Sequence, residues 1–141
     1  MTTLSANLKR RFEFEPLPIF NDVPMVGTDT IFEGAAVGES SSLGLARPLV
    51  AADSFMGFAV EKAINAGAAS AQSVRISERG RVKLSVTGVT SEADHRATVY
   101  ADDDNAFTLT NSSNSTIGKV ARWISGTTCI VAYESVAQRS I

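Results

Sequence analysis

Three consecutive aspartates and an asparagine stand together within the stretch VYADDDNAFTLT. Clustered carboxylates could hold calcium, and an EF-hand loop places oxygen ligands at alternating positions, glycine at the sixth and glutamate at the twelfth. Counted from Asp102, Phe107 is sixth and Ser113 is twelfth, so the EF-hand pattern fails and only a weaker surface calcium site stays open. Adjacent carboxylates on a turn also splay apart, whereas acid–base catalysis needs two groups held in a cleft. Turn chemistry suffices to explain Asp102, Asp103, Asp104 and Asn105.

Other side chains that could do chemistry are few. The chain has one cysteine, Cys129, and one histidine, His95, which excludes an intramolecular disulfide and a structural zinc site. Cys129 lies in the apolar run CIVAY, which favours a buried thiol. No serine stands in a G-x-S-x-G motif, and the glycines form neither a phosphate loop nor a dinucleotide fingerprint. We therefore predict no catalytic residue, no metal and no cofactor.

Composition indicates one globular domain. The chain has 141 residues, of which 44% are hydrophobic and 20% charged, enough apolar surface for a single core. Thirteen basic and fifteen acidic residues leave a net charge of -2, which argues against nucleic acid as the main partner. No apolar run approaches the roughly 20 residues that span a bilayer, so we expect no membrane partner and synthesis in a cytoplasm.

Charge is unevenly distributed between two segments. Residues 75–83 carry four cations and one acid, whereas residues 91–105 carry five acids and one cation. Two solvated faces are the simpler interpretation. The alternative hypothesis is a closed ring, in which the basic segment of one subunit meets the acidic loop of its neighbour. The residues of this charge pairing would be Arg75, Arg79, Arg81, Lys83, Asp102, Asp103 and Asp104.

The elements that must position these residues are short strands. From Thr30 onward, apolar segments are broken by Gly, Ser, Asn or Asp at the spacing of an all-β sandwich or barrel. In 73–88, apolar residues alternate on both sides of Glu78-Arg79-Gly80, which predicts a β-hairpin with its turn at the glycine. The only helices expected are short ones, at NLKRRF and at SEADHR, where Ser91 could be the cap.

The first 29 residues differ from the rest. They contain three of the four prolines and lack a sustained helical period, so we predict an extended arm over 1–29 and a compact β-rich domain over 30–141. Several apolar side chains between Phe12 and Phe20 are unsuited to a solvated tail. The arm is therefore expected to lie against its own body or against a partner.

Four segments carry a family resemblance: IFEGAAVGES, GLARPLVAADSFMGFAVEKA, RGRVKLSVTGVTSEADHRATVYADDDNAFTLT and STIGKVARWISGTTCIVAY. Their ordered features are a glycine after FE, an AD-F-GF step, a glycine-flanked basic stretch, VYA before an acidic turn, and IGKV. In this order they resemble the capsid cement, or head decoration, proteins of tailed bacteriophages. The resemblance covers residues 31–133.

The resemblance implies an accessory protein on the outer surface of the phage capsid, commonly a homotrimer with a β-tulip-like domain. Such proteins have no catalytic residues, and they bind neighbouring major capsid protein subunits and stabilise the expanded head. It also implies that the arm contacts the shell through Leu8, Lys9, Arg10, Arg11, Phe12, Phe14, Leu17, Ile19 and Phe20. Two alternatives remain: another virion β-domain, in the tail or in receptor binding, and a small β-barrel ligand-binding module or enzyme with His95 and two carboxylates in a deep pocket.

Overall fold

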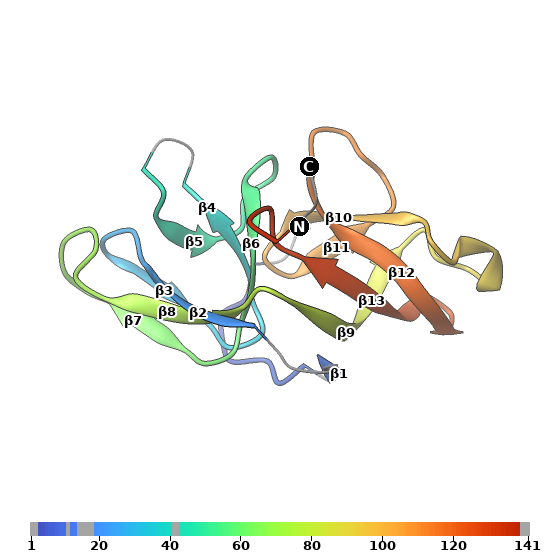
Figure 1. Cartoon of the computed structure of the whole chain (residues 1–141), viewed down its shortest axis with the longest axis horizontal. Coiled ribbons are helices and arrows are strands. Elements are labelled where there is room, and N and C mark those ends of the chain that lie inside the picture. Colours follow the sequence, from blue (N-terminus) through green and yellow to red (C-terminus); the bar gives the residue numbers. More distant parts are fainter. Residues whose placement is uncertain (1–2, 11, 14–18, 41–42, 139–141) are drawn as a thin grey trace.

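The computed structural model describes residues 3–10, 12–13, 19–40 and 43–138, and its regular structure is almost entirely β-strand. Figure 1 shows two lobes side by side: β2 to β8 build one, and β9 to β13 build the other. The predicted all-β class is confirmed.

The second lobe is a closed barrel. Its sheet has the order β1-β9-β11-β10-β12-β13, and a further pairing of β9 with β13 closes five of these strands on themselves. All the pairings are antiparallel except that of β11 with β9. The strands are β1 (Phe12–Glu13), β9 (Arg79–Thr87), β10 (Thr98–Asp103), β11 (Ala106–Thr108), β12 (Ser115–Ser125) and β13 (Thr128–Glu134).

The first lobe contains a five-stranded sheet of order β2-β8-β6-β4-β5 and a two-stranded sheet, β3-β7. A parallel bridge from Met25 to Ala46 links the chain just after β2 to the edge strand β5. The strands are β2 (Phe20–Pro24), β3 (Asp29–Ile31), β4 (Ala36–Glu39), β5 (Ala46–Pro48), β6 (Ser54–Ala59), β7 (Ala63–Asn65) and β8 (Ser73–Ser77).

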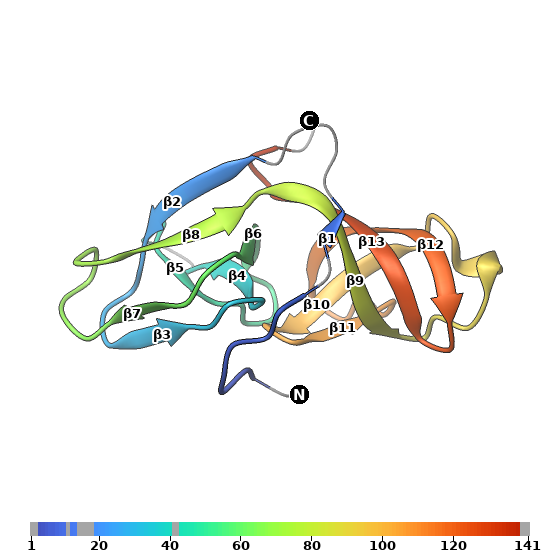
Figure 2. The ribbon, with the colours of Figure 1, turned by 90° about the horizontal axis from the view of Figure 1, so that it is seen from below.

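The hairpin predicted over 73–88 is wrong. Its alternation is real, because Val74 and Ile76 on β8 and Val82 on β9 are buried. However, β8 pairs with β2 and β6, whereas β9 pairs with β1, β11 and β13. Glu78 lies between the two strands, and the chain passes there from one lobe to the other in one continuous curve (Figure 2). The two strands bury their apolar faces in different cores, so they do not face each other.

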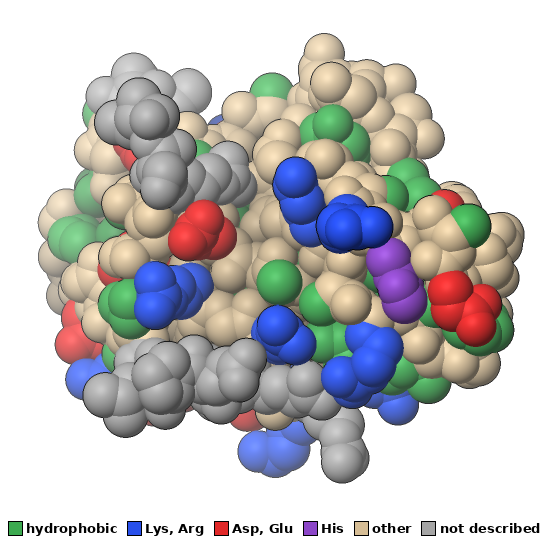
Figure 3. Space-filling view, turned by 45° about the vertical axis from the view of Figure 1, so that its right-hand side comes forward, with side chains coloured by type: hydrophobic (Ala, Val, Ile, Leu, Met, Phe, Trp, Pro, Cys, Tyr) green, Lys and Arg blue, Asp and Glu red, His purple; other side chains and the backbone are tan. Residues whose placement is uncertain are grey.

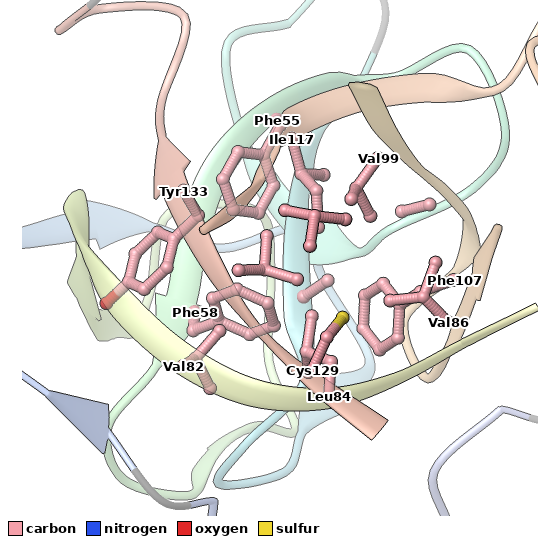
Figure 4. Close-up of a cluster of buried hydrophobic side chains, with 14 of the residues drawn as sticks. Phe55, Phe58, Val82, Leu84, Val86, Val99, Phe107, Ile117, Cys129 and Tyr133 are labelled. Atoms are coloured by element: carbon pink, nitrogen blue, oxygen red, sulfur yellow. The ribbon is translucent and has the colours of Figure 1, made fainter. Parts of the chain in front are cut away.

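Strand β6 joins the two cores. Its residues Phe55 and Phe58 belong to the barrel core, whereas Ala59 belongs to the core of the first lobe. The Phe58 ring meets the Tyr133 ring edge-on at a centroid distance of 4.9 Å, and the Phe55 ring at 5.5 Å (Figure 4). Such edge-to-face contacts add to the stabilisation from burial. The lobes therefore share one aromatic junction.

The predicted arm is partly built into this body. Phe12 on β1 pairs with Val82 and packs against the barrel core, and β2 is a full strand of the first lobe's sheet. Val23 and Met25 are buried. The division predicted at residue 29 therefore has no counterpart in the structure.

Only one of the two short helices is found. A 3₁₀ helix, η1 (Glu92–Asp94), has the predicted Ser91 cap, because the Ser91 hydroxyl accepts a hydrogen bond from the Ala93 amide. Residues 7–10, the described part of NLKRRF before Phe12, are not helical.

Candidate functional site

The acidic stretch is the turn of a hairpin, as predicted, but it is not a solvated edge. Strands β10 and β11 are antiparallel, with Tyr100 opposite Thr108 and Asp103 opposite Ala106. The expectation of solvated carboxylates is wrong for two of the three aspartates: Asp103 is 5% exposed and Asp104 is 1% exposed. Buried carboxylates need partners, and here the partners come from the beginning of the chain.

Residues Thr3–Arg10 lie across this turn at the junction of the lobes, and we call them the N-terminal strap. The Leu4 amide donates a hydrogen bond to Asp104 Oδ1 at 3.1 Å, and the Thr3 hydroxyl donates one to Asp103 Oδ2 at 3.5 Å. Asp103 Oδ1 also accepts from the Asn105 amide at 2.8 Å, which fixes the turn. Figure 2 shows the strap running past the junction toward β1.

Arg10 fixes the other end of the strap. Its Nε donates to the Gly34 carbonyl at 2.5 Å, and its Nη2 donates to Asn105 Oδ1 at 2.8 Å. Its guanidinium carbon also lies 5.6 Å from the ring centroid of Phe58 and 5.3 Å from that of Phe107. Cations at such distances are attracted by aromatic faces. One side chain thus contacts both lobes and their aromatic junction.

Burial changes the acidity of both charged groups. Desolvation raises the pKa of Asp104 to about 6, opposed by the Leu4 hydrogen bond and by the attraction of Arg10. Desolvation lowers the pKa of Arg10 to about 10, against the attraction of Asp104. In both cases removal from water outweighs the opposite charge nearby.

Gly34 makes room for the strap. It has a φ of +89°, and a Cβ at this position would lie 2.1 Å from the Leu8 carbonyl oxygen. The strap approaches closely here because the Leu8 amide donates to the Glu33 carbonyl at 2.8 Å, and Asn7 Oδ1 accepts from the Glu33 amide at 3.1 Å. Sequence reasoning missed Gly34 as a strap contact, although a glycine after FE was part of the pattern.

The residues predicted to contact a shell are therefore divided. Leu8, Arg10 and Phe12 lie against their own chain, and Lys9 forms an exposed ion pair with Glu33 at 3.6 Å. Farther along, the Ile19 carbonyl accepts from the Glu78 amide at 2.8 Å, and Phe20 is 50% exposed at the sheet edge. Three of the predicted residues lie outside the described part of the chain: Arg11, Phe14 and Leu17.

The basic residues predicted to act together are split between the lobes. Arg75 is on β8, where its guanidinium pairs with Asp22 at 3.0 Å. Arg79, Arg81 and Lys83 are on β9, in the barrel. The structure does not bring the four cations into one hairpin face, and burial removes Asp103 and Asp104 from the predicted acidic face.

The other side chains that could react, His95 and Cys129, form a hydrogen bond and pack in the core, respectively. His95 Nε2 accepts a hydrogen bond from the Trp123 amide at 3.0 Å. Cys129 is buried in the barrel core, and desolvation raises the pKa of its thiol to about 11. Within the described residues, no group of three or more His, Cys, Asp or Glu is placed to hold a metal ion. In the same part of the chain, no helix is long and apolar enough to cross a membrane.

Comparison with known proteins adds no relative: no protein-family model matches the chain, and neither does any curated protein sequence.

Proposed function

We propose that this chain is a structural virion protein. In this proposal it binds the outer surface of a phage capsid and cements neighbouring major capsid protein subunits, and so stabilises the expanded head. It acts as a homotrimer, without a cofactor and without catalysis.

The observation that carries the proposal is where the four resembling segments lie in the fold, because they form most of the strands and the core of the barrel. The four resembling segments contain β4 to β6, β9 to β12 and all of β13 except its last residue, and they include one residue each of β3 and β7. They also supply every residue of the barrel core cluster, including Phe55, Phe58 and Tyr133. The resemblance therefore lies in residues that build the fold, and a shared pattern at such positions supports a shared architecture.

Rigidity also supports the proposal. A protein that clamps shell subunits must transmit load between its contact surfaces without yielding. The lobes are joined by the shared aromatic cluster, by the continuous passage from β8 to β9, and by Arg10. Close packing of this kind resists deformation. Each additional contact with the shell raises the effective concentration for the next.

The test is cryo-electron microscopy of capsids made with and without this protein, combined with sedimentation of the purified chain with expanded heads. Density on the outer surface, at sites that bridge shell subunits, is the expected result. Density confined to the tail would instead support the alternative virion role, and no binding to heads would refute the proposal. Light scattering of the purified protein tests the trimer.

Deleting residues 1–20 is a poor binding test for this chain. The deletion removes Arg10 and Phe12, which pack at the junction and on the barrel core. A sharper variant is Phe20→Ser, because this side chain is half exposed on β2. Loss of head binding with unchanged folding would locate a shell contact at this edge.

A further inference from the structure

Two rows of cations stand on the outer face of the barrel, one on each side of β13. On β9, Lys83 lies opposite Ile130 and Arg81 lies opposite Ala132. On β12, on the other side of β13, Arg122 lies opposite the same Ile130 and Lys119 opposite the same Ala132. Lys83, Ile130 and Arg122 therefore lie side by side across the three strands, and so do Arg81, Ala132 and Lys119. Each set of three has a cation at both ends.

The barrel core fixes the direction in which these side chains point. Successive residues of a strand face opposite sides, and the neighbours Val82, Leu84, Val120 and Val131 are buried in the barrel core. On β12, strict alternation would point Arg122 inward like Val120, but a bulge between these two residues turns the Arg122 side chain outward. Because neighbouring strands are about 4.8 Å apart, the two rows lie about 10 Å apart, with about 7 Å between cations within a row. Figure 3 shows Lys and Arg side chains gathered over this lobe.

Between the rows lie Ile130 and Ala132, and the next residue of β13 on the same face is Glu134, opposite Arg79. Ile130 is 2% exposed although it belongs to neither core cluster. It must therefore be covered from the outside, and long basic side chains commonly cover apolar surface with their aliphatic stems while the charge stays in water. The result is an outer face of the barrel with a row of cations on each side of small and apolar side chains, and we call this face the channel.

The charge of this channel is incompletely balanced. The salt bridges among the described residues involve Lys9, Arg47 and Arg75, and none includes Lys83 or Lys119. Arg81 and Arg122 each take part in an interaction within the chain, so the charge offered to a partner is that of Lys83 and Lys119, which are exposed.

We propose that this face, defined by Arg81, Lys83, Lys119 and Arg122, binds a carboxylate-rich segment of a partner protein. Complementary charge steers such a segment to the channel and fixes its register. A peptide laid along the direction of β13 brings its carboxylates within reach of the cations of both rows. The proposal does not depend on the capsid role.

A protein segment fits this face better than a nucleic acid does. The cationic area is small, and the chain as a whole carries a net charge of -2, which repels an extended polyanion beyond the channel. Binding of single strands also relies on aromatic side chains on which bases stack. The residues that line the channel are aliphatic or basic.

The matched test compares two double variants that each lose two positive charges. One double variant, Lys83→Gln with Lys119→Gln, removes two charges from the channel. The control, Lys62→Gln with Arg75→Gln, removes the same charge from the first lobe, where Lys62 lies over the Phe32 ring and Arg75 pairs with Asp22. The probes are a glutamate decapeptide, an uncharged Gly-Ser decapeptide and a thymidine decanucleotide. Binding is followed by amide NMR shifts at low ionic strength and across a salt series.

The glutamate peptide should bind the unaltered protein, shift amides of β9, β12 and β13, and weaken with salt. Loss of two exposed charge contacts should weaken its binding about ten-fold in the channel variant, while the control variant binds like the unaltered protein. Failure of the glutamate peptide to bind would overturn the proposal, as would equal weakening in both variants. Equal or tighter binding of the oligonucleotide would also overturn it, as would self-association that only the channel variant abolishes.

Discussion

Replacing Asp104 with asparagine should stabilise the protein at alkaline pH. The aspartate carboxylate is buried at the turn, and its pKa is raised from 3.8 to about 6 because burial penalises the charged form. Asparagine has the same shape without the charge, and its side-chain oxygen can still accept the hydrogen bond from the Leu4 amide. The variant therefore resembles the protonated wild type at every pH.

The magnitude follows from the size of the pKa shift. A rise from 3.8 to about 6 corresponds to about 3 kcal/mol between the two protonation states, a net value that already includes the attraction of Arg10. The favourable contribution of the protonated group is fully present below pH 3.8 and is lost as the pH rises through about 6. Relaxation of the turn reduces the effect. The Asp104→Asn variant should therefore match the wild type near pH 3.8 and exceed it by about 1 to 3 kcal/mol at pH 8.

Chemical denaturation at a series of pH values measures this difference, with the fluorescence of Trp123, the only tryptophan, as the signal. Asp102→Asn is the control, because it removes the same charge from a half-exposed position two residues earlier, in β10, and should change stability by about 0.5 kcal/mol or less. If Asp104→Asn is instead less stable than the wild type at pH 8 and equal to it near pH 3.8, the attraction of Arg10 outweighs desolvation and the reasoning is refuted.

Three further predictions concern the strap and the barrel. Gly34→Ala should displace the strap, because the new Cβ would meet the Leu8 carbonyl oxygen; the Leu8 amide should then exchange hydrogen faster, and unchanged exchange would contradict this. Tyr133→Phe should cost about 1 kcal/mol in unfolding experiments, because the Tyr133 hydroxyl lies 2.7 Å from Ser77 Oγ in a buried hydrogen bond; a neutral result would contradict this and mean that the bond from Ser77 Oγ to the Arg79 carbonyl is sufficient. Cys129 should resist a thiol reagent at pH 8 until the barrel unfolds, since burial raises the thiol pKa to about 11; fast labelling of the folded protein would argue against this core position.

Apolar alternation in the sequence predicts short strands after residue 30, but it does not predict β2, which lies in the segment expected to be an arm. Alternation at Val82, Leu84 and Val86 identifies the inward side of β9 correctly. It does not identify the partner strand, because a glycine beside a short polar break is typical of hairpin turns. Here Gly80 lies within β9 opposite Tyr133. Whether a strand pairs with its neighbour or with a distant segment depends on which core its apolar face completes, and no local pattern contains that information.

The candidate site likewise depends on contacts between distant residues that a local sequence pattern does not contain. Local chemistry explains the turn at Asp103 and Asn105, since the Asp103 carboxylate accepts from the Asn105 amide. The burial of Asp104 depends on Leu4, which lies 100 positions away, and the other end of the strap depends on Arg10. A run of aspartates in the sequence suggests exposure. Contacts over such separations become visible only when the chain is folded.

The contact between Arg10 and Asn105 also affects the timing of synthesis. The two residues are 95 positions apart, so a ribosome adding about 5 to 20 residues per second completes Asn105 roughly 5 to 20 s after Arg10. Throughout that interval the Arg10 guanidinium has neither its amide partner nor the ring of Phe107, although the Gly34 carbonyl and the Phe58 ring are made earlier. The strap is thus made well before the turn that it contacts, and it cannot reach its native position until that turn has been made.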